Sequence, residues 1–203
     1  NNTDNIIYMV NRFGKMLNGS SKGYLNRSQP PYLSMMVADV YKVTGDKDWL
    51  AGAVEALEKE YRFWMTERIT PCGLNRYSSS ASDEEKIAMA MLVRERFREP
   101  GFLDGLSQDE IIEVGSHYTA EAESGWDFNP RFEGRCEDFC PIDLNSNLYI
   151  YETNFMYFYS ELGVEDEIIH WQKAADRRKD LMEEYCYDSY ANLFFDYDFV
   201  NNR

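Results

Sequence analysis

One short segment of this chain combines an acidic group, a glycine and two aromatic rings. It reads Glu-Ser-Gly-Trp-Asp-Phe from Glu123 to Phe128 and places Asp127 between the two rings. Flat rings offer surface for a sugar face. Apolar surroundings raise the pKa of a carboxyl group, as a general acid at neutral pH requires. The alternative is that Asp127 caps a turn before Asn129 and Pro130. Residue types alone favour the turn cap.

A second segment, residues 18–31, places polar groups in a stiff stretch of backbone. Arg27 and Gln29 stand two residues apart, next to Pro30 and Pro31. The prolines restrict the backbone, so that a guanidinium and an amide could point toward one ligand. Sugar hydroxyls need such donors and acceptors. Alternatively, Arg27 pairs with one of the many acids of the chain, and the residue types leave both interpretations open.

Several segments resemble, in order, the motifs of the trehalases of glycoside hydrolase family 37. The strongest are the Arg-Ser-Gln-Pro-Pro stretch that ends at Pro31 and the Ser-Gly-Trp-Asp-Phe stretch that ends at Phe128. Weaker matches, alone not specific, are Asn18-Gly19, Leu74-Asn75-Arg76-Tyr77, Pro141–Ser146 and Phe195–Asp198. Together these segments extend over almost the whole chain.

The resemblance implies an all-α fold, an (α/α)6 toroid of six inner and six outer helices. It implies inverting hydrolysis of the disaccharide α,α-trehalose to two glucoses, with no cofactor. Asp127 matches the general acid of the family, which protonates the glycosidic oxygen while a second carboxylate activates water on the opposite face. The residues that match segments lining the sugar pocket are Asn18, Arg27, Gln29, Gly125 and Trp126.

The sequence also departs from the family pattern. Its Gly-Gly-Arg-Phe, Gln-Trp-Asp and base-containing segments are absent from residues 1–203, and Ser78–Ser82 stands where Arg-Pro-Glu-Ser is expected. We therefore expect residues 1–203 to be a single helical region, about half of a toroid, inactive alone because the general base is missing. Unpartnered inner helix faces would favour self-association. Two alternatives remain: hydrolysis of another α-glucoside, or a non-catalytic helical module that binds sugar or a partner.

Apolar residues recur with helical spacing along nearly the whole chain. Two capping boxes, Ser82 with Glu85 and Ser107 with Glu110, predict helix starts. The pattern predicts seven helices, at 4–17, 31–44, 46–67, 82–96, 107–121, 143–161 and 165–186, with short extended stretches near 73–77 and 193–199.

The overall charge argues against two classes of partner. The 203 residues carry 21 Lys and Arg against 36 Asp and Glu, a formal net charge of -15. Such a chain repels nucleic-acid phosphates and anionic membrane surfaces. No apolar run approaches the roughly 20 residues of a membrane span. We therefore expect neither partner, whereas a neutral disaccharide is compatible with this charge.

The N-terminal residues and the cysteines give weaker indications of where the chain begins and of the compartment in which it lies. The polar start, Asn1–Asp4, has no Met and no signal peptide, so we expect the chain to begin inside a longer reading frame or after processing. Four cysteines form no dense framework of disulfides, which indicates a reducing, cytoplasmic location. Cys136 and Cys140, like His117 and His170, lack further ligands at metal spacing, so no metal site is expected.

Overall fold

The computed structural model describes residues 2–19 and 24–203. The chain falls into two compact units, each described here by itself. The first comprises Asn1–Met16, Pro31–Asn75 and Cys140–Tyr197, and the second comprises Leu17–Pro30, Arg76–Phe139 and Asp198–Arg203.

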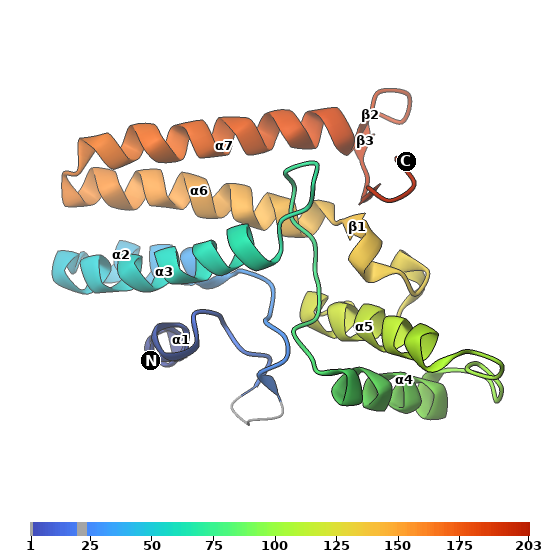
Figure 1. Cartoon of the computed structure of the whole chain (residues 1–203). Coiled ribbons are helices and arrows are strands. Elements are labelled where there is room, and N and C mark those ends of the chain that lie inside the picture. The colour runs from blue at the N-terminus through green and yellow to red at the C-terminus, as the bar shows by residue number, and fades with distance from the viewer. Residues whose placement is uncertain (1, 20–23) are drawn as a thin grey trace. The chain divides into compact units, whose positions relative to one another are not determined.

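Five helices build the first unit: α1 (Asn2–Phe13), α2 (Leu33–Thr44), α3 (Lys47–Glu67), α6 (Ile142–Leu162) and α7 (Glu165–Tyr185). The last two lie side by side as an antiparallel pair, and α6 also packs against α2 and α3 (Figure 1). Gly163 turns the chain between them in the left-handed conformation, with φ of 76°. The short connection therefore forces α7 to return along α6.

The core of the first unit is aromatic at its centre. The rings of Phe155 and Trp171 stack with centroids 4.0 Å apart, and Tyr61 meets Trp171 edge-on at 5.0 Å. Aromatic residues make up 15% of the sequence, and those of this cluster fill a helical core, where each ring removes a large apolar area from water. Other buried members of this cluster are Val10, Leu33, Val37, Leu50, Val54, Leu57, Tyr151 and Phe158.

A buried polar network connects α6, α7 and the turn that follows α3. Arg178 donates to Glu152 at 2.8 Å, to the Asn75 side chain at 2.9 Å and to Asn145 at 3.0 Å. The Asn145 side chain in turn accepts from the Asn75 backbone N–H and donates to its carbonyl, each at 2.9 Å. Since Arg178 and Glu152 are buried, removing either partner would leave an uncompensated charge.

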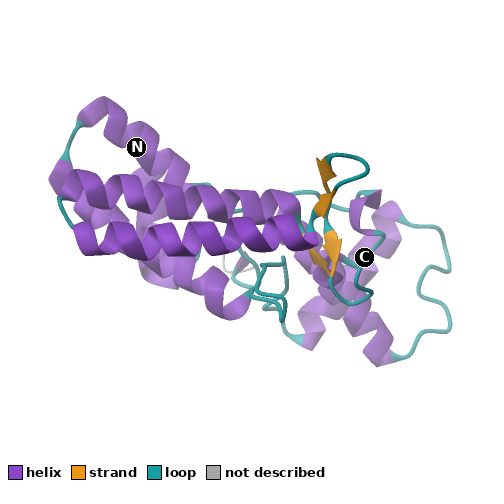
Figure 2. Cartoon of the chain, turned by 90° about the horizontal axis from the view of Figure 1, so that it is seen from above, coloured by secondary structure: helices purple, strands orange, loops and turns teal. Residues whose placement is uncertain are grey.

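Strands are few and short in the part of the chain that the structure describes (Figure 2). They are β1 (Phe139–Cys140), β2 (Tyr187–Asp188), β3 (Leu193–Phe194) and β4 (Tyr197–Asp198), with β2 and β3 paired antiparallel. No helix of the described residues is long and apolar enough to cross a membrane.

The second unit is organised around an α-hairpin of α4 (Asp83–Phe97) and α5 (Gln108–Ser124). Both predicted capping boxes are present at the starts of these helices, at Ser82 and Ser107. Two short 3-10 helices follow, η2 (Pro130–Phe132) and η3 (Cys136–Asp138). The hairpin matters for function because the candidate acid lies directly after α5.

The structure confirms seven α-helices among the described residues, with small differences at the ends. The predicted first helix, 4–17, is wrong at its C-terminus: it ends at Phe13 because Gly14 adopts φ of 75°. Leu17 instead forms an antiparallel bridge with Ser28. The helix predicted at 107–121 continues to Ser124, where Gly125 ends it.

A close approach of α4 and α5 at Gly115 gives the first prediction. A Cβ at Gly115 on α5 would lie 1.9 Å from the backbone carbonyl oxygen of Lys86 on α4. Gly115→Ala must therefore force the hairpin apart, and we expect a loss of about 3 kcal/mol or more in the free energy of unfolding, measured by urea denaturation. Gly52→Ala is the matched control, because that helical glycine has open space around it and should gain about 0.5–1 kcal/mol. A Gly115→Ala chain as stable as the wild type would contradict this packing.

Candidate active site

The turn after α5 positions Asp127. Gly125 follows the helix with φ of 75°, a left-handed conformation that costs glycine little. The Ser124 hydroxyl donates to the Glu121 carbonyl at 2.7 Å and accepts from the Trp126 backbone N–H at 3.0 Å. These bonds fix the direction in which the chain leaves the helix, so Trp126 and Asp127 project at a defined place.

Phe128, the residue directly after Asp127, is fixed by ring contacts. Its φ of 55° is unusual for a bulky residue, and such strain persists only where surrounding contacts impose it. Here the contacts are rings: Phe97 of α4 lies 4.9 Å from Phe128 between centroids, and Tyr118 of α5 lies 5.9 Å away. The hairpin thus supplies the apolar support that the sequence predicted beside Asp127.

Glu123 joins the two segments on which the functional interpretation depends. Its carboxylate is fully buried, and accepts from the Ser28 backbone N–H at 2.7 Å and from the Ser78 backbone N–H at 2.9 Å. Ser28 lies between Arg27 and Gln29, so one side chain ties the Gln-Pro-Pro loop to the helix that carries Asp127. A Cβ placed on Gly125 would lie 4.0 Å from Pro30, which confirms that the two segments are adjacent.

Arg27 is buried beside this junction. Its guanidinium donates to Asn26 at 2.8 Å and to the Asn18 side chain at 3.4 Å, and it stacks over the Tyr24 ring at 5.2 Å. Asn18 in turn donates to the Ala122 carbonyl of α5 at 3.3 Å. The Arg27 Nε–H is buried and has no partner among the described residues, so this guanidinium keeps a free donor.

Asp127 lies on the exposed side of the turn, close enough to Arg27 for their charges to interact. Partial burial of the carboxyl group raises the pKa of Asp127, and the Arg27 charge opposes that rise without cancelling it. The group thus has the direction of shift that an acid catalyst needs.

The structure brings most of the predicted site residues together. Asn18, Arg27, Gly125 and Asp127 lie around the junction that Glu123 makes. Gln29 is half-buried there, and its side-chain amide has no hydrogen-bond partner among the described residues. Trp126 is 48% exposed and has the Arg131 guanidinium 5.1 Å from its ring centroid.

Sequence reasoning missed the roles of Arg131, Glu121 and Glu123. For Arg131, a cation shortly after an exposed ring was a usable signal. Glu121 and Glu123 lie on a helical stretch that is otherwise buried, and two acids in an apolar helix end indicate internal partners or a shifted pKa. Only the fold shows which of the two acids has a partner.

Glu121 is the acid whose side chain stays unsatisfied. It is fully buried, and neither carboxylate oxygen has a partner in hydrogen-bonding geometry among the described residues. Burial raises the pKa of Glu121 to about 7, against the smaller influences of the Phe128 backbone N–H and the Arg98 charge. A carboxyl group with this pKa beside Asp127 titrates near neutral pH.

Glu137 is a partly buried acid that hydrogen bonds hold in place. It accepts from the Ser78 hydroxyl at 2.5 Å and from the Ser79 backbone N–H at 3.1 Å. Burial pushes the pKa of Glu137 upward, but the hydrogen bonds from Ser78 and Ser116 outweigh it, and the pKa is lowered. Glu123 and Glu137 are thus committed to holding the Ser78 loop and are not available as a water-activating base.

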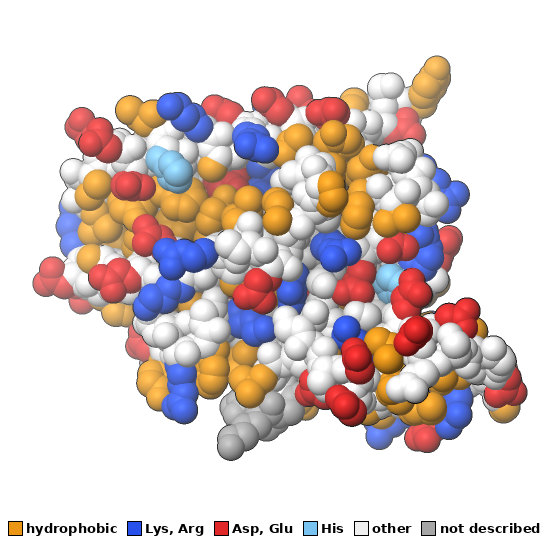
Figure 3. All heavy atoms as spheres, viewed as in Figure 1, with side chains coloured by type: hydrophobic (Ala, Val, Ile, Leu, Met, Phe, Trp, Pro, Cys, Tyr) orange, Lys and Arg blue, Asp and Glu red, His pale blue; other side chains and the backbone are white. Residues whose placement is uncertain are grey.

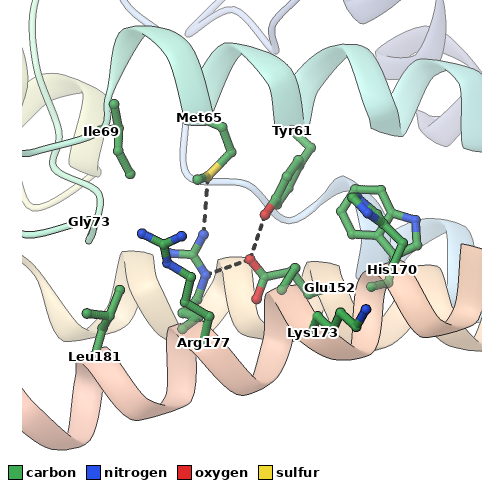
Figure 4. Close-up of a pocket in the computed structure, with 12 residues that line it drawn as sticks. Tyr61, Met65, Ile69, Gly73, Glu152, His170, Lys173, Arg177 and Leu181 are labelled. Carbon is green, nitrogen blue, oxygen red and sulfur yellow. Dashed lines mark hydrogen bonds and ion pairs between the residues drawn. The ribbon is translucent and has the colours of Figure 1, made fainter.

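A cavity also lies in the first unit, away from Asp127. It is a groove of about 520 Å³ between α3 and α7, lined by Tyr61, Met65, Ile69, Glu152, Trp171 and Leu181 among others. Hydrophobic side chains gather along this groove (Figure 3). Tyr61 and Glu152 point toward each other across it (Figure 4). Because Glu152 is already paired with Arg178, the groove shows no free acid for catalysis.

The Glu123 junction can be tested by one atom change. Glu123→Gln replaces one acceptor oxygen with an amide that faces a backbone N–H. We expect the free energy of unfolding to fall by about 1–3 kcal/mol, because a buried donor loses its partner. Glu113→Gln, at an exposed position on the same helix, is the matched control and should stay within about 0.5 kcal/mol of the wild type. Equal stability of the two variants would contradict the junction.

Glu121 predicts a pH dependence of stability. Because the folded state keeps this proton where the unfolded chain releases it, the free energy of unfolding falls as the pH rises from about 4.5 to about 7. Glu121→Gln removes this loss, so the variant should match the wild type at pH 4 and exceed it at pH 8 by up to about 3 kcal/mol. Urea titrations at several pH values measure the difference. A difference that does not change with pH would refute the shifted titration.

Known proteins are similar to this chain over nearly its whole length. The family profile described as "Trehalase" matches residues 2–203. The chain is 30% identical over 219 residues to "Trehalase" from Apis mellifera, covering 98% of this chain and 34% of that protein. It is 31% identical over 238 residues to "Cytosolic neutral trehalase" from Emericella nidulans, covering 98% of this chain and 32% of that protein. It thus spans about a third of the length of these curated relatives.

Among solved structures, the chain is similar to neutral trehalase Nth1 from Saccharomyces cerevisiae. The TM-score is 0.80 at 29% sequence identity, covering 99% of this chain and 42% of that one. This similarity confirms the predicted all-α fold. The chain forms part of an (α/α)6 toroid. The match of the family profile over nearly the whole length shows that this chain belongs to the trehalase family.

Proposed function

We propose that the protein carrying this chain hydrolyses α,α-trehalose to two glucoses with inversion, using Asp127 as general acid. The observation that carries the proposal is the junction at Glu123, which places the Arg-Ser-Gln-Pro-Pro loop beside the Asp127 turn. Membership of the trehalase family supplies the reaction. The raised pKa of Asp127 supports its role, since the group must be protonated before it can donate.

The neighbouring residues have distinct tasks in this proposal. Trp126 offers exposed ring surface on which a glucose ring packs, and the Arg131 guanidinium, 5.1 Å from the ring centroid, helps to hold that ring in place. Arg27, Gln29 and Asn18 contact sugar hydroxyls. The Arg27 Nε–H, which has no partner among the described residues, and the half-buried Gln29 amide are suited to this. As Asp127 gives up its proton, the Arg27 charge stabilises the carboxylate that remains.

Inversion needs a second carboxylate that activates water on the opposite face of the sugar. Glu123 and Glu137 accept backbone N–H groups, and Glu152 is paired with Arg178. We therefore infer that the general base belongs to a part of the protein outside residues 1–203, and that this chain alone is inactive. Self-association of the isolated chain remains a prediction that light scattering tests.

A second candidate keeps the mechanism and changes the substrate to another α-glucoside. The observation that favours it is the loop of Ser78 to Ser80, where the family has Arg-Pro-Glu-Ser. This loop contains no Lys or Arg and so offers no cation to a ligand. Its Ser78 hydroxyl and Ser79 backbone N–H are both bonded to Glu137. Comparing hydrolysis of trehalose, maltose and aryl α-glucosides by the whole protein separates the two candidates.

We also infer a cytoplasmic location. The similar protein from Emericella nidulans is named a cytosolic neutral trehalase, as is one from Saccharomyces cerevisiae. The four cysteines of this chain are all free, as in a reducing compartment. Fractionation of cells that express the tagged whole protein tests the location.

The proposed acid is tested by Asp127→Asn in the whole protein. We expect kcat for trehalose to fall about 10²–10⁴-fold with little change in KM, because proton donation is lost while binding groups remain. Asp48→Asn, at an exposed position on α3, is the matched control and should keep full activity. Undiminished hydrolysis by Asp127→Asn would remove this residue from the mechanism.

A further inference from the structure

Two cysteines that are far apart in sequence meet in the first unit. Cys72 lies in the turn after α3, and Cys140 lies two residues before α6. Their sulfur atoms are 3.8 Å apart, and the Thr70 hydroxyl contacts both, at 3.1 Å from Cys72 and 3.5 Å from Cys140. The 68 residues between them explain why no sequence motif reveals the pair.

The two thiols differ in reactivity. Cys72 is half-buried, whereas Cys140 is fully buried. A hydrogen bond from the Cys140 thiol is the largest influence that lowers the pKa of Cys72 to about 6, and burial opposes it. The pKa of Cys140 is raised by its hydrogen bond to Cys72 and by burial. The pair thus consists of an accessible thiolate, the nucleophilic form, and a protected thiol beside it.

The turn that carries Cys72 is well ordered by its own hydrogen bonds. The Thr70 backbone N–H donates to the Leu74 carbonyl at 2.9 Å, the Thr70 hydroxyl donates to the same carbonyl at 2.7 Å, and Gly73 N–H donates to Thr70 at 3.0 Å. A disulfide needs sulfurs about 2.05 Å apart. The two sulfurs, now 3.8 Å apart, must therefore approach each other for the bond to form.

We propose that Cys72 and Cys140 are a redox-sensitive pair that closes to a disulfide when the protein meets hydrogen peroxide. The Cys72 thiolate attacks one peroxide oxygen, the O–O bond breaks, and the released hydroxide takes up a proton to become water. The Cys140 sulfur then displaces hydroxide from the Cys72 sulfenic acid, and the Cys140 proton leaves with it as a second water. Two thiols are oxidised and one peroxide is reduced.

The bond would tie two structural elements to each other. It would join the turn after α3 to the start of α6, beside the Asn75 and Asn145 pair that Arg178 holds. Gly73 in the same turn closes one end of the groove shown in Figure 4, where a Cβ would lie 3.1 Å from Leu181. Oxidation would thus stiffen this end of the groove and restrict the unfolded chain by a long covalent loop.

A metal site does not explain the cluster. No group of three or more His, Cys, Asp or Glu within residues 2–19 and 24–203 is arranged to hold a metal ion. Cys186 is buried near the pair and its pKa is raised to about 12, mainly by burial, so it lacks the thiolate character of Cys72. It therefore serves as an internal control, as does buried Cys136.

The test treats the reduced whole protein with hydrogen peroxide, blocks remaining thiols with N-ethylmaleimide and maps peptides by mass spectrometry. We expect a peptide pair joined through Cys72 and Cys140, lighter by two hydrogens, that dithiothreitol separates. Cys186→Ser and Cys136→Ser should form the same link. Cys72→Ala should form none, and Cys140→Ala should leave Cys72 as sulfenic or higher acid.

The second readout is the melting temperature, Tm. It is measured for the wild-type protein after oxidation and again after the oxidised protein has been reduced. We expect oxidation to raise Tm by about 5–10 °C, and Cys72→Ala to abolish this rise. Because Cys72 is half-buried, its variant tests the proposal even where Cys140→Ala fails to fold. Linkage of Cys72 to Cys186, oxidation of Cys72 to sulfinic acid in the wild type without a link, or alkylation of Cys72 no faster than of Cys186 would each overturn the proposal.

Discussion

The two hydrogen bonds that Glu123 accepts hold the candidate site together. A buried carboxylate between the backbone N–H groups of Ser28 and Ser78 connects the end of α5 with two loops that are distant in sequence. A backbone donor left without a partner in that position would cost more than the bond itself contributes. The placement of Arg27 and Gln29 beside the Asp127 turn therefore depends on this side chain, together with the bond from Asn18 to the Ala122 carbonyl of α5.

Environment assigns different tasks to the four neighbouring acids. Glu123 and Glu137 accept hydrogen bonds from N–H and O–H donors and hold loops in place. Glu121 lacks such donors, and burial raises its pKa to about 7. Asp127 stands at the surface of the same cluster, where partial burial and the Arg27 charge act in opposite directions. Only Asp127 combines an exposed carboxyl with a raised pKa, the combination that proton donation to a bound substrate requires.

Much of the fold could be predicted from the sequence because its signals are local. The capping boxes at Ser82 and Ser107 marked helix starts, and apolar spacing marked the seven helices. Gly14 was missed as the end of the first helix, since helical spacing continues past it and only the backbone angle reveals the stop. The motifs indicated Asp127 and Arg27, but not Glu123, whose donors lie 95 and 45 residues away. The Cys72 and Cys140 contact escaped for the same reason, because pairing across 68 residues leaves no local pattern.

The claim that Asp127 is the proton donor is tested most directly by changing how much the leaving group needs a proton. Fluoride departs from α-glucosyl fluoride with little protonation, whereas the sugar oxygen of trehalose requires it. In the whole protein, Asp127→Asn should lose trehalose hydrolysis yet retain most of its activity on the fluoride, so that the ratio of the two kcat/KM values shifts by about 10²-fold or more. Equal losses on both substrates would show that Asp127 acts in binding or structure and contradict its assignment as the acid.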